Sequence, residues 1–66
     1  MSELVKVYYF VGDREIKSVF QCRVPSVGDG VRLKGSKIDS TSYLVTKRAW
    51  FIDHGVTAIT IDMKEL

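Results

Sequence analysis

The sequence predicts an all-β fold, a small five-stranded antiparallel barrel. Short segments in which apolar and polar residues alternate recur along the chain, and many of their apolar residues are β-branched or aromatic. Glycines at positions 12, 28, 30, 35 and 55 separate these segments where turns are needed. The 66 residues, 45% of them hydrophobic and 27% charged, are enough for one globular domain, residues 1–66.

The first two strands are expected to form an antiparallel hairpin. Leu4–Val11 alternates but is largely apolar on both faces, so this strand should be central or covered. Gly12–Glu15 is a short turn, and Ile16–Val24 is the second strand. Pro25 has no N–H to donate and ends it.

Three further strands are expected after a turn at residues 25–30. They are separated by a polar loop, Gly35–Ser42, and by the tight hairpin loop Asp53–Gly55, in which Gly55 can take a positive φ. The expected strands are Val31–Lys34, Tyr43–Ile52 and Val56–Met63.

The fourth strand leaves the orientation of Trp50 open. Tyr43 and Val45 fit one face, but the next position on that face is Lys47. A bulge near Lys47 and Arg48 would shift the alternation and turn Trp50 inward. Without a bulge, Trp50 points outward together with Arg48.

Five short strands favour a curled sheet, because a flat one leaves its edges open and covers only one face. Closure into a small barrel removes most of this exposure. We prefer a Src-homology-3-like barrel. The oligonucleotide/oligosaccharide-binding barrel usually has a helix between its third and fourth strands, and Gly35–Ser42 is too short and too rich in Gly and Ser for one.

A resemblance covers roughly residues 24–63. Residues 24–33 read VPSVGDGVRL and are followed by Tyr43-Leu44-Val45 and Trp50. This pattern resembles a group of very small bacterial and bacteriophage β proteins with a Pro-x-Val-Gly-Asp-x-Val-x-Leu motif, mostly of unassigned function. The resemblance implies a β fold and a phage or mobile-element setting, and it implies no active residues.

Catalysis is not expected. The one His, His54, lies in a hairpin loop, and Cys22 should share an apolar face with Phe20 and Val24, where a thiol is inert. The carboxylates lie at turns and have no spacing typical of acid–base work or of a metal loop. We therefore predict no enzyme activity, cofactor, metal site or small-molecule substrate.

Binding to another protein, or self-association, is the preferred function. Tyr8, Phe10, Trp50 and Arg48 are the predicted contacts, since aromatic and Arg side chains are the usual anchors of protein interfaces. The alternative is a single-stranded nucleic acid, because the net charge is +5 over residues 17–48, with seven basic and two acidic residues. Its predicted contacts are Lys17, Arg23, Arg32, Lys34 and Arg48.

The location is expected to be cytoplasmic, with Cys22 reduced. No apolar run approaches the roughly 20 residues of a membrane span. Met1–Phe10 also lacks the basic start, apolar stretch and cleavage site of a signal peptide. A membrane is therefore not an expected partner.

Overall fold

The computed structural model describes the backbone of residues 4–34 and 40–66, and the side chains of residues 4–32 and 42–66. All regular elements in these residues are strands, so the predicted all-β class is confirmed. The described part contains no helix that is long and apolar enough to cross a membrane. The strands are β1 (Val5–Val11), β2 (Arg14–Gln21), β3 (Gly30–Lys34), β4 (Ser40–Asp53) and β5 (Val56–Glu65).

The number of strands is as predicted, but some boundaries differ. The second strand begins at Arg14 and ends at Gln21, three residues short of the expected Val24. The fourth begins at Ser40 and so includes residues expected in a loop. The rest of that expected loop, residues 35–39, lies outside the described residues.

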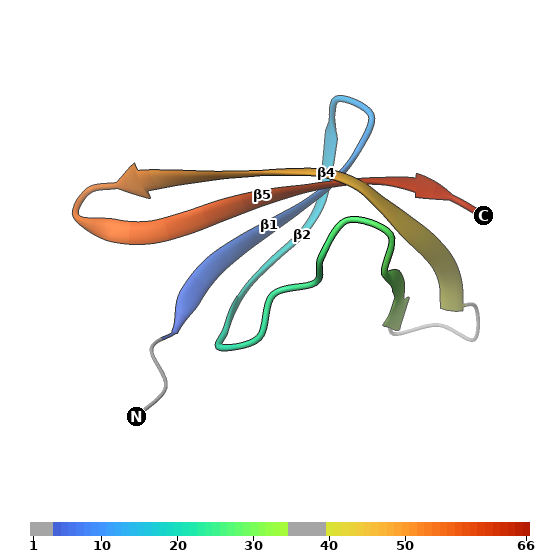
Figure 1. Cartoon of the computed structure of the whole chain (residues 1–66), viewed down its shortest axis with the longest axis horizontal. Helices are drawn as coiled ribbons and strands as arrows, with labels where there is room; N and C mark the ends of the chain where they lie inside the picture. The colour runs from blue at the N-terminus through green and yellow to red at the C-terminus, as the bar shows by residue number, and fades with distance from the viewer. Residues whose placement is uncertain (1–3, 35–39) are drawn as a thin grey trace.

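The strands form one sheet in the order β2-β1-β5-β4-β3. Three pairings are antiparallel, but β1 pairs with β5 in parallel, so the prediction of an all-antiparallel barrel is wrong at its centre. A parallel pairing needs a long connection, and three intervening strands supply it. The sheet curls into a half-barrel, and within the described residues its edge strands β2 and β3 make no contact (Figure 1).

Two short hairpin loops fix the register of β1 with β2 and of β4 with β5. Gly12 has φ 64° at the first central position of the loop before Arg14. His54 (φ 50°) and Gly55 (φ 81°) both have positive φ between the paired residues Asp53 and Val56. Positive φ at both central positions is typical of a type I′ turn, whose twist matches that of the strands. The expected hairpin at Gly55 is confirmed.

One face of the sheet carries the core, and we call it the core face. Its buried side chains come from the three central strands: Val7, Tyr9, Val45, Ile59, Ile61 and Met63. The Tyr9 hydroxyl donates a hydrogen bond to Gln21 Oε1 at 3.0 Å, so its burial leaves no unpaired donor. Burial raises the pKa of Tyr9 above its usual value of 10.0, and the hydrogen bond to Gln21 offsets part of the rise.

A bulge in β4 decides the orientation of Trp50. Val45 pairs with Met63 and Lys47 pairs with Asp62, so Thr46 is an extra residue between them. The expected bulge therefore exists, slightly earlier than predicted. It places Trp50 opposite Ile59, on the core face, and places Phe51 on the other face, which we call the outer face.

Residues 22–29 pass beneath the core face between β2 and β3 (Figure 1). Gly28 N donates to Val45 O at 2.9 Å, and Val45 N donates to Asp29 O at 3.0 Å. Asp29 Oδ2 accepts from Ser26 N at 2.8 Å and stabilises the turn, the capping role that this Asp suits. These bonds join the segment to β4 at the bulge.

Candidate protein-binding surface

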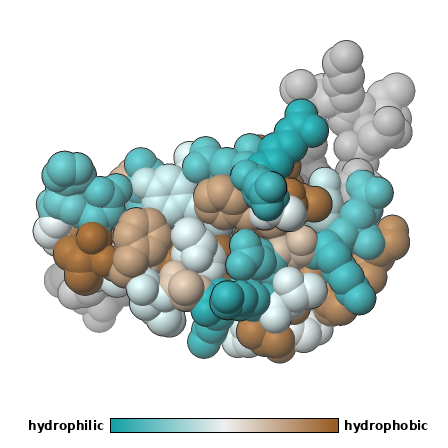
Figure 2. Space-filling view, turned by 90° about the horizontal axis from the view of Figure 1, so that it is seen from above, coloured by the Kyte–Doolittle hydropathy of each residue, from teal (hydrophilic) through white to brown (hydrophobic). Residues whose placement is uncertain are grey.

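Exposed hydrophobic side chains gather at one end of the sheet. Nine large ones are exposed among the described residues, and six lie at the end that carries the β4–β5 hairpin. In Figure 2, viewed from above Figure 1, brown hydrophobic residues lie near the left end, where Figure 1 shows this hairpin. We call the six the hairpin-end surface: Leu4, Phe20, Trp50, Phe51, Ile52 and Val56.

The outer part of this surface is an aromatic cluster around a lysine. One row across the sheet runs Phe20, Lys6, Ala58 and Phe51, because these residues pair in register. The Phe51 ring stacks on Tyr8, with centroids 5.9 Å apart and an interplanar angle of 28°. Lys6 Nζ lies 5.2 Å from the Tyr8 centroid and 5.7 Å from that of Phe20, so cation–π attraction holds its ammonium group over the rings.

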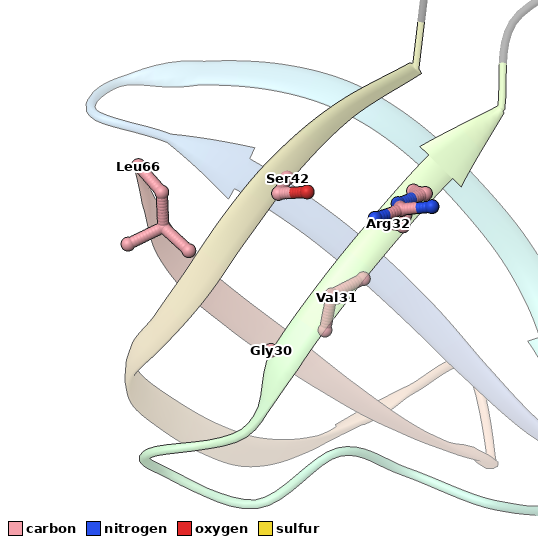
Figure 3. A pocket seen from close by; sticks show the side chains of 5 residues that line it. All are labelled: Gly30, Val31, Arg32, Ser42 and Leu66. Atoms are coloured by element: carbon pink, nitrogen blue, oxygen red, sulfur yellow. The ribbon is translucent and has the colours of Figure 1, made fainter.

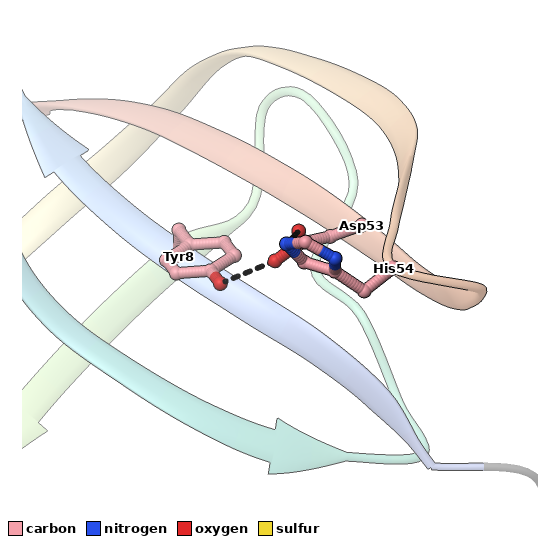
Figure 4. Close-up of polar contacts among 3 residues, drawn as sticks. All are labelled: Tyr8, Asp53 and His54. Carbon is pink, nitrogen blue, oxygen red and sulfur yellow. Dashed lines mark hydrogen bonds and ion pairs between the residues drawn. The ribbon is translucent and has the colours of Figure 1, made fainter.

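A polar contact ties this cluster to the hairpin loop. The Tyr8 hydroxyl donates to Asp53 Oδ2 at 3.4 Å, and His54 Nε2 lies 3.6 Å from Asp53 Oδ1 (Figure 4). The His54 side chain is 96% exposed, so its ion pair is weak whenever the imidazole is charged. The contact orients the Tyr8 ring.

The core-face part of the surface projects beyond the core. Trp50 and Ile52 follow each other on this face, and they are 53% and 69% exposed. Arg48, one step nearer the bulge, donates from Nη1 to Pro25 O at 3.0 Å. The connecting segment therefore covers the face as far as Arg48 and leaves Trp50 half open.

The four residues predicted for protein binding do not lie on one face. Tyr8 and Phe10 are half-buried on the outer face, whereas Trp50 and Arg48 lie on the core face. Tyr8 and Trp50 adjoin the hairpin end, and Phe10 lies two rows from it, paired with Asp62. Sequence reasoning missed five of the six members of the surface: Leu4, Phe20, Phe51, Ile52 and Val56.

The residues predicted for nucleic-acid binding are scattered. Lys17 pairs with Tyr9 in β2, Arg32 lies in β3, and Arg23 is exposed after β2. The guanidinium of Arg48 is engaged with Pro25, and the Lys34 side chain lies outside the described ones. The four of these residues whose side chains are described are therefore not gathered beside the aromatic cluster.

Cys22 is exposed, and its predicted place on a buried apolar face is wrong. The reason is that β2 ends at Gln21, so strand alternation no longer positions Cys22. Phe20, predicted on the same apolar face, is likewise exposed, and Val19 packs on the core instead.

A metal-binding group and a ligand pocket are the other kinds of site that the described residues could form. They contain no group of three His, Cys, Asp or Glu residues that could hold a metal ion. A hollow of about 280 Å³ lies between β3 and the end of β5, and of its described lining only Arg32 is charged (Figure 3). The lining is Gly30, Val31, Arg32, Ser42 and Leu66. No family model, curated protein or solved structure matches this chain.

Proposed function

We propose that this chain is a non-enzymatic binding module whose hairpin-end surface docks on another protein. The observation that carries the proposal is the gathering of six of the nine exposed large hydrophobic side chains at one end of the sheet. Large apolar side chains that gather at one end of a small domain are typical of an interaction site. The resemblance of residues 24–63 to small bacterial and phage proteins supports a phage or mobile-element setting.

The charges around the surface favour a protein over a nucleic acid. On the outer face two lysines, Lys6 and Lys47, are interspersed with three carboxylates, Glu15, Asp53 and Asp62. A phosphate backbone is bound by a run of Lys and Arg that neutralises it, and this mixture of charges does not provide one. A protein interface tolerates mixed charges at its rim.

Trp50 is the expected anchor. Trp50 is half-exposed and follows Arg48 on the core face, where a hydrogen bond to Pro25 O holds the guanidinium. Trp and Arg are among the residues most enriched in the hot spots of protein interfaces. Its backbone is fixed by the pairing of β4 with β5 opposite Ile59, so the indole can lose its remaining water contact on binding without a large backbone change.

A photo-crosslinking amino acid at position 50, compared with one at Arg32, tests the proposal in the cell that expresses the chain. We expect position 50 to cross-link to one defined protein and position 32 to give no such adduct. The purified partner should then bind Trp50→Ala at least about tenfold more weakly, and Arg32→Ala with little change, at both low and high salt.

The opposite pattern would overturn the proposal. Its signature is submicromolar binding to a single-stranded oligonucleotide at physiological salt, lost in Lys17→Glu and Arg48→Glu and kept in Trp50→Ala. That result would show that the basic residues, and not the hairpin end, carry the function. Equal cross-linking from positions 50 and 32 would also contradict it.

A further inference from the structure

The outer face has a charge pattern that is complementary to itself. Two rows farther from the hairpin than the Phe20–Phe51 row, paired residues place Glu15, Phe10, Asp62 and Lys47 side by side across the four strands. This row begins with an acid on β2 and ends with a base on β4. The hairpin-end row likewise begins and ends with an aromatic residue, Phe20 on β2 and Phe51 on β4.

A two-fold axis can run parallel to the strands just above the outer face, over the line between β1 and β5. Rotation about this axis brings the residues of one copy opposite residues of complementary type in the other. Such an axis lays β2 of one copy over β4 of the other and β1 over β5, as in an aligned sheet sandwich. Glu15 of each copy then faces Lys47 of the other, and Phe20 faces Phe51. A two-fold contact doubles each of these matches.

We propose that the outer face binds a second copy of this chain, forming a two-fold sandwich of two half-barrels. This inference rests on the proposed function in that it uses the outer part of the hairpin-end surface. It leaves Trp50 and Ile52, which lie on the core face, free for a different protein.

The sheet edges offer a poorer contact between copies. In β2 the extra residue Ile16 makes a bulge opposite Tyr9 and Phe10, and Lys17 shares the core face with Tyr9. A bulge and an inward charge are the features by which natural edge strands avoid pairing with another chain. The outer face has no such protection, and β4 and β5 run nearly straight along it from the hairpin to the bend (Figure 1).

The remaining charges of the face are compatible with this arrangement. Asp62 pairs with Lys47 in its own sheet, so the second copy's Glu15 joins an existing cluster of opposite charges. Lys6 would lie diagonally across from Asp53 of the second copy, and that carboxylate is held on the outer face by Tyr8. In this arrangement, no charged side chain of these rows would have only charges of its own sign as charged neighbours.

The size of the face predicts a weak dimer. Four strands about 4.8 Å apart and four rows about 7 Å apart, from the row of Asp53 to the row of Glu15, cover at most roughly 500 Å² per copy, because the sheet curls. The total of about 1,000 Å² is at the lower limit of specific interfaces, which suits a reversible contact. The expected dissociation constant is on the order of micromolar, so concentration decides the state.

Sedimentation equilibrium over about 1–500 μM tests the dimer, since this range spans a micromolar dissociation constant. We expect the mass to rise from 7.5 kDa toward twice that value. Glu15→Lys and Lys47→Glu should each weaken association about tenfold or more, because each reversal places like charges together twice. An equimolar mixture of the two variants should regain association, because each mixed contact then joins opposite charges. Arg32→Glu, an exposed reversal in β3 and so outside the four strands of the proposed contact, is the matched control.

Each outcome decides the question. A wild-type mass of 7.5 kDa at every concentration, or association unaffected by both reversals, would overturn the dimer. So would a mixture no better associated than either variant alone. A monomer that still cross-links through position 50 to another protein would leave the proposed function standing. A dimer without that adduct would leave only the self-association.

Discussion

Two isoleucines in neighbouring strands, Ile59 and Ile52, should respond very differently to the same substitution. Ile59 lies in β5 between Val7 and Trp50, and its side chain is fully buried. Ile52 lies in β4 on the same core face but is 69% exposed. Replacing each by Val removes one methylene group and keeps the β-branched shape that strands favour, so the comparison isolates burial.

The magnitude follows from the burial of each side chain. Ile59→Val should lower the free energy of unfolding by about 0.5–1.5 kcal/mol, the transfer of a methylene group plus a small cavity. Ile52→Val should change it by less than about 0.5 kcal/mol. Ile59→Ala would cost about 2–5 kcal/mol, a large part of the roughly 3–10 kcal/mol expected for a domain of this size, so Val is the safer change.

Urea unfolding followed by circular dichroism measures both variants at one dilute concentration. In a thermal scan, Ile59→Val should lower the Tm by roughly 2–12 °C, since each kcal/mol is worth about 4–8 °C in a domain of this size. Equal losses at the two positions would refute the assignment of the core face. A loss at Ile52 alone would show that the hairpin end, and not the centre of the sheet, holds the fold.

Two further predictions concern single side chains. Because burial raises the Tyr9 pKa in the folded state, the unfolded chain loses this proton first, so the unfolding free energy should fall as the pH rises above about 10. Tyr9→Phe, which also loses the hydrogen bond to Gln21, should remove the contribution of Tyr9 to this fall when denaturation is measured at several pH values. An unchanged dependence of the unfolding free energy on pH would contradict the prediction. The exposed Cys22 thiol should react with a thiol reagent in the native protein as completely as in urea, and protection in the native state would show that it is buried after all.

The all-β class and the five strands could be predicted because alternation and glycine placement are local signals. Gly12 and Gly55 mark their hairpins through backbone freedom alone, and both have positive φ. The bulge in β4 was foreseeable within a residue, since Lys47 interrupts the alternation that Val45 begins. The parallel pairing of β1 with β5 had no such local signal, because it joins segments at opposite ends of the sequence.

The surface was harder to predict than the fold. Exposure depends on where the neighbouring strands end, and periodicity does not give those ends. The alternation predicts Phe20 on a buried face together with Val24 only if one strand runs through both residues, whereas β2 stops at Gln21. The three consecutive apolar residues Trp50, Phe51 and Ile52 were the available signal, since a strand with both faces apolar next to a hairpin loop must expose one of them.

The parallel contact between β1 and β5 also has a kinetic consequence. Strand β5 is the centre of the sheet, with β1 on one side and β4 on the other, and it is the last strand to leave the ribosome. The β1–β2 hairpin can form early, but alone it has no sheet to pack on and is marginally stable. Val7 and Ile59 therefore become buried only when β5 pairs with β1. The loop that this pairing closes is nearly the whole chain, so folding should take milliseconds to seconds, much slower than in helical domains of similar length.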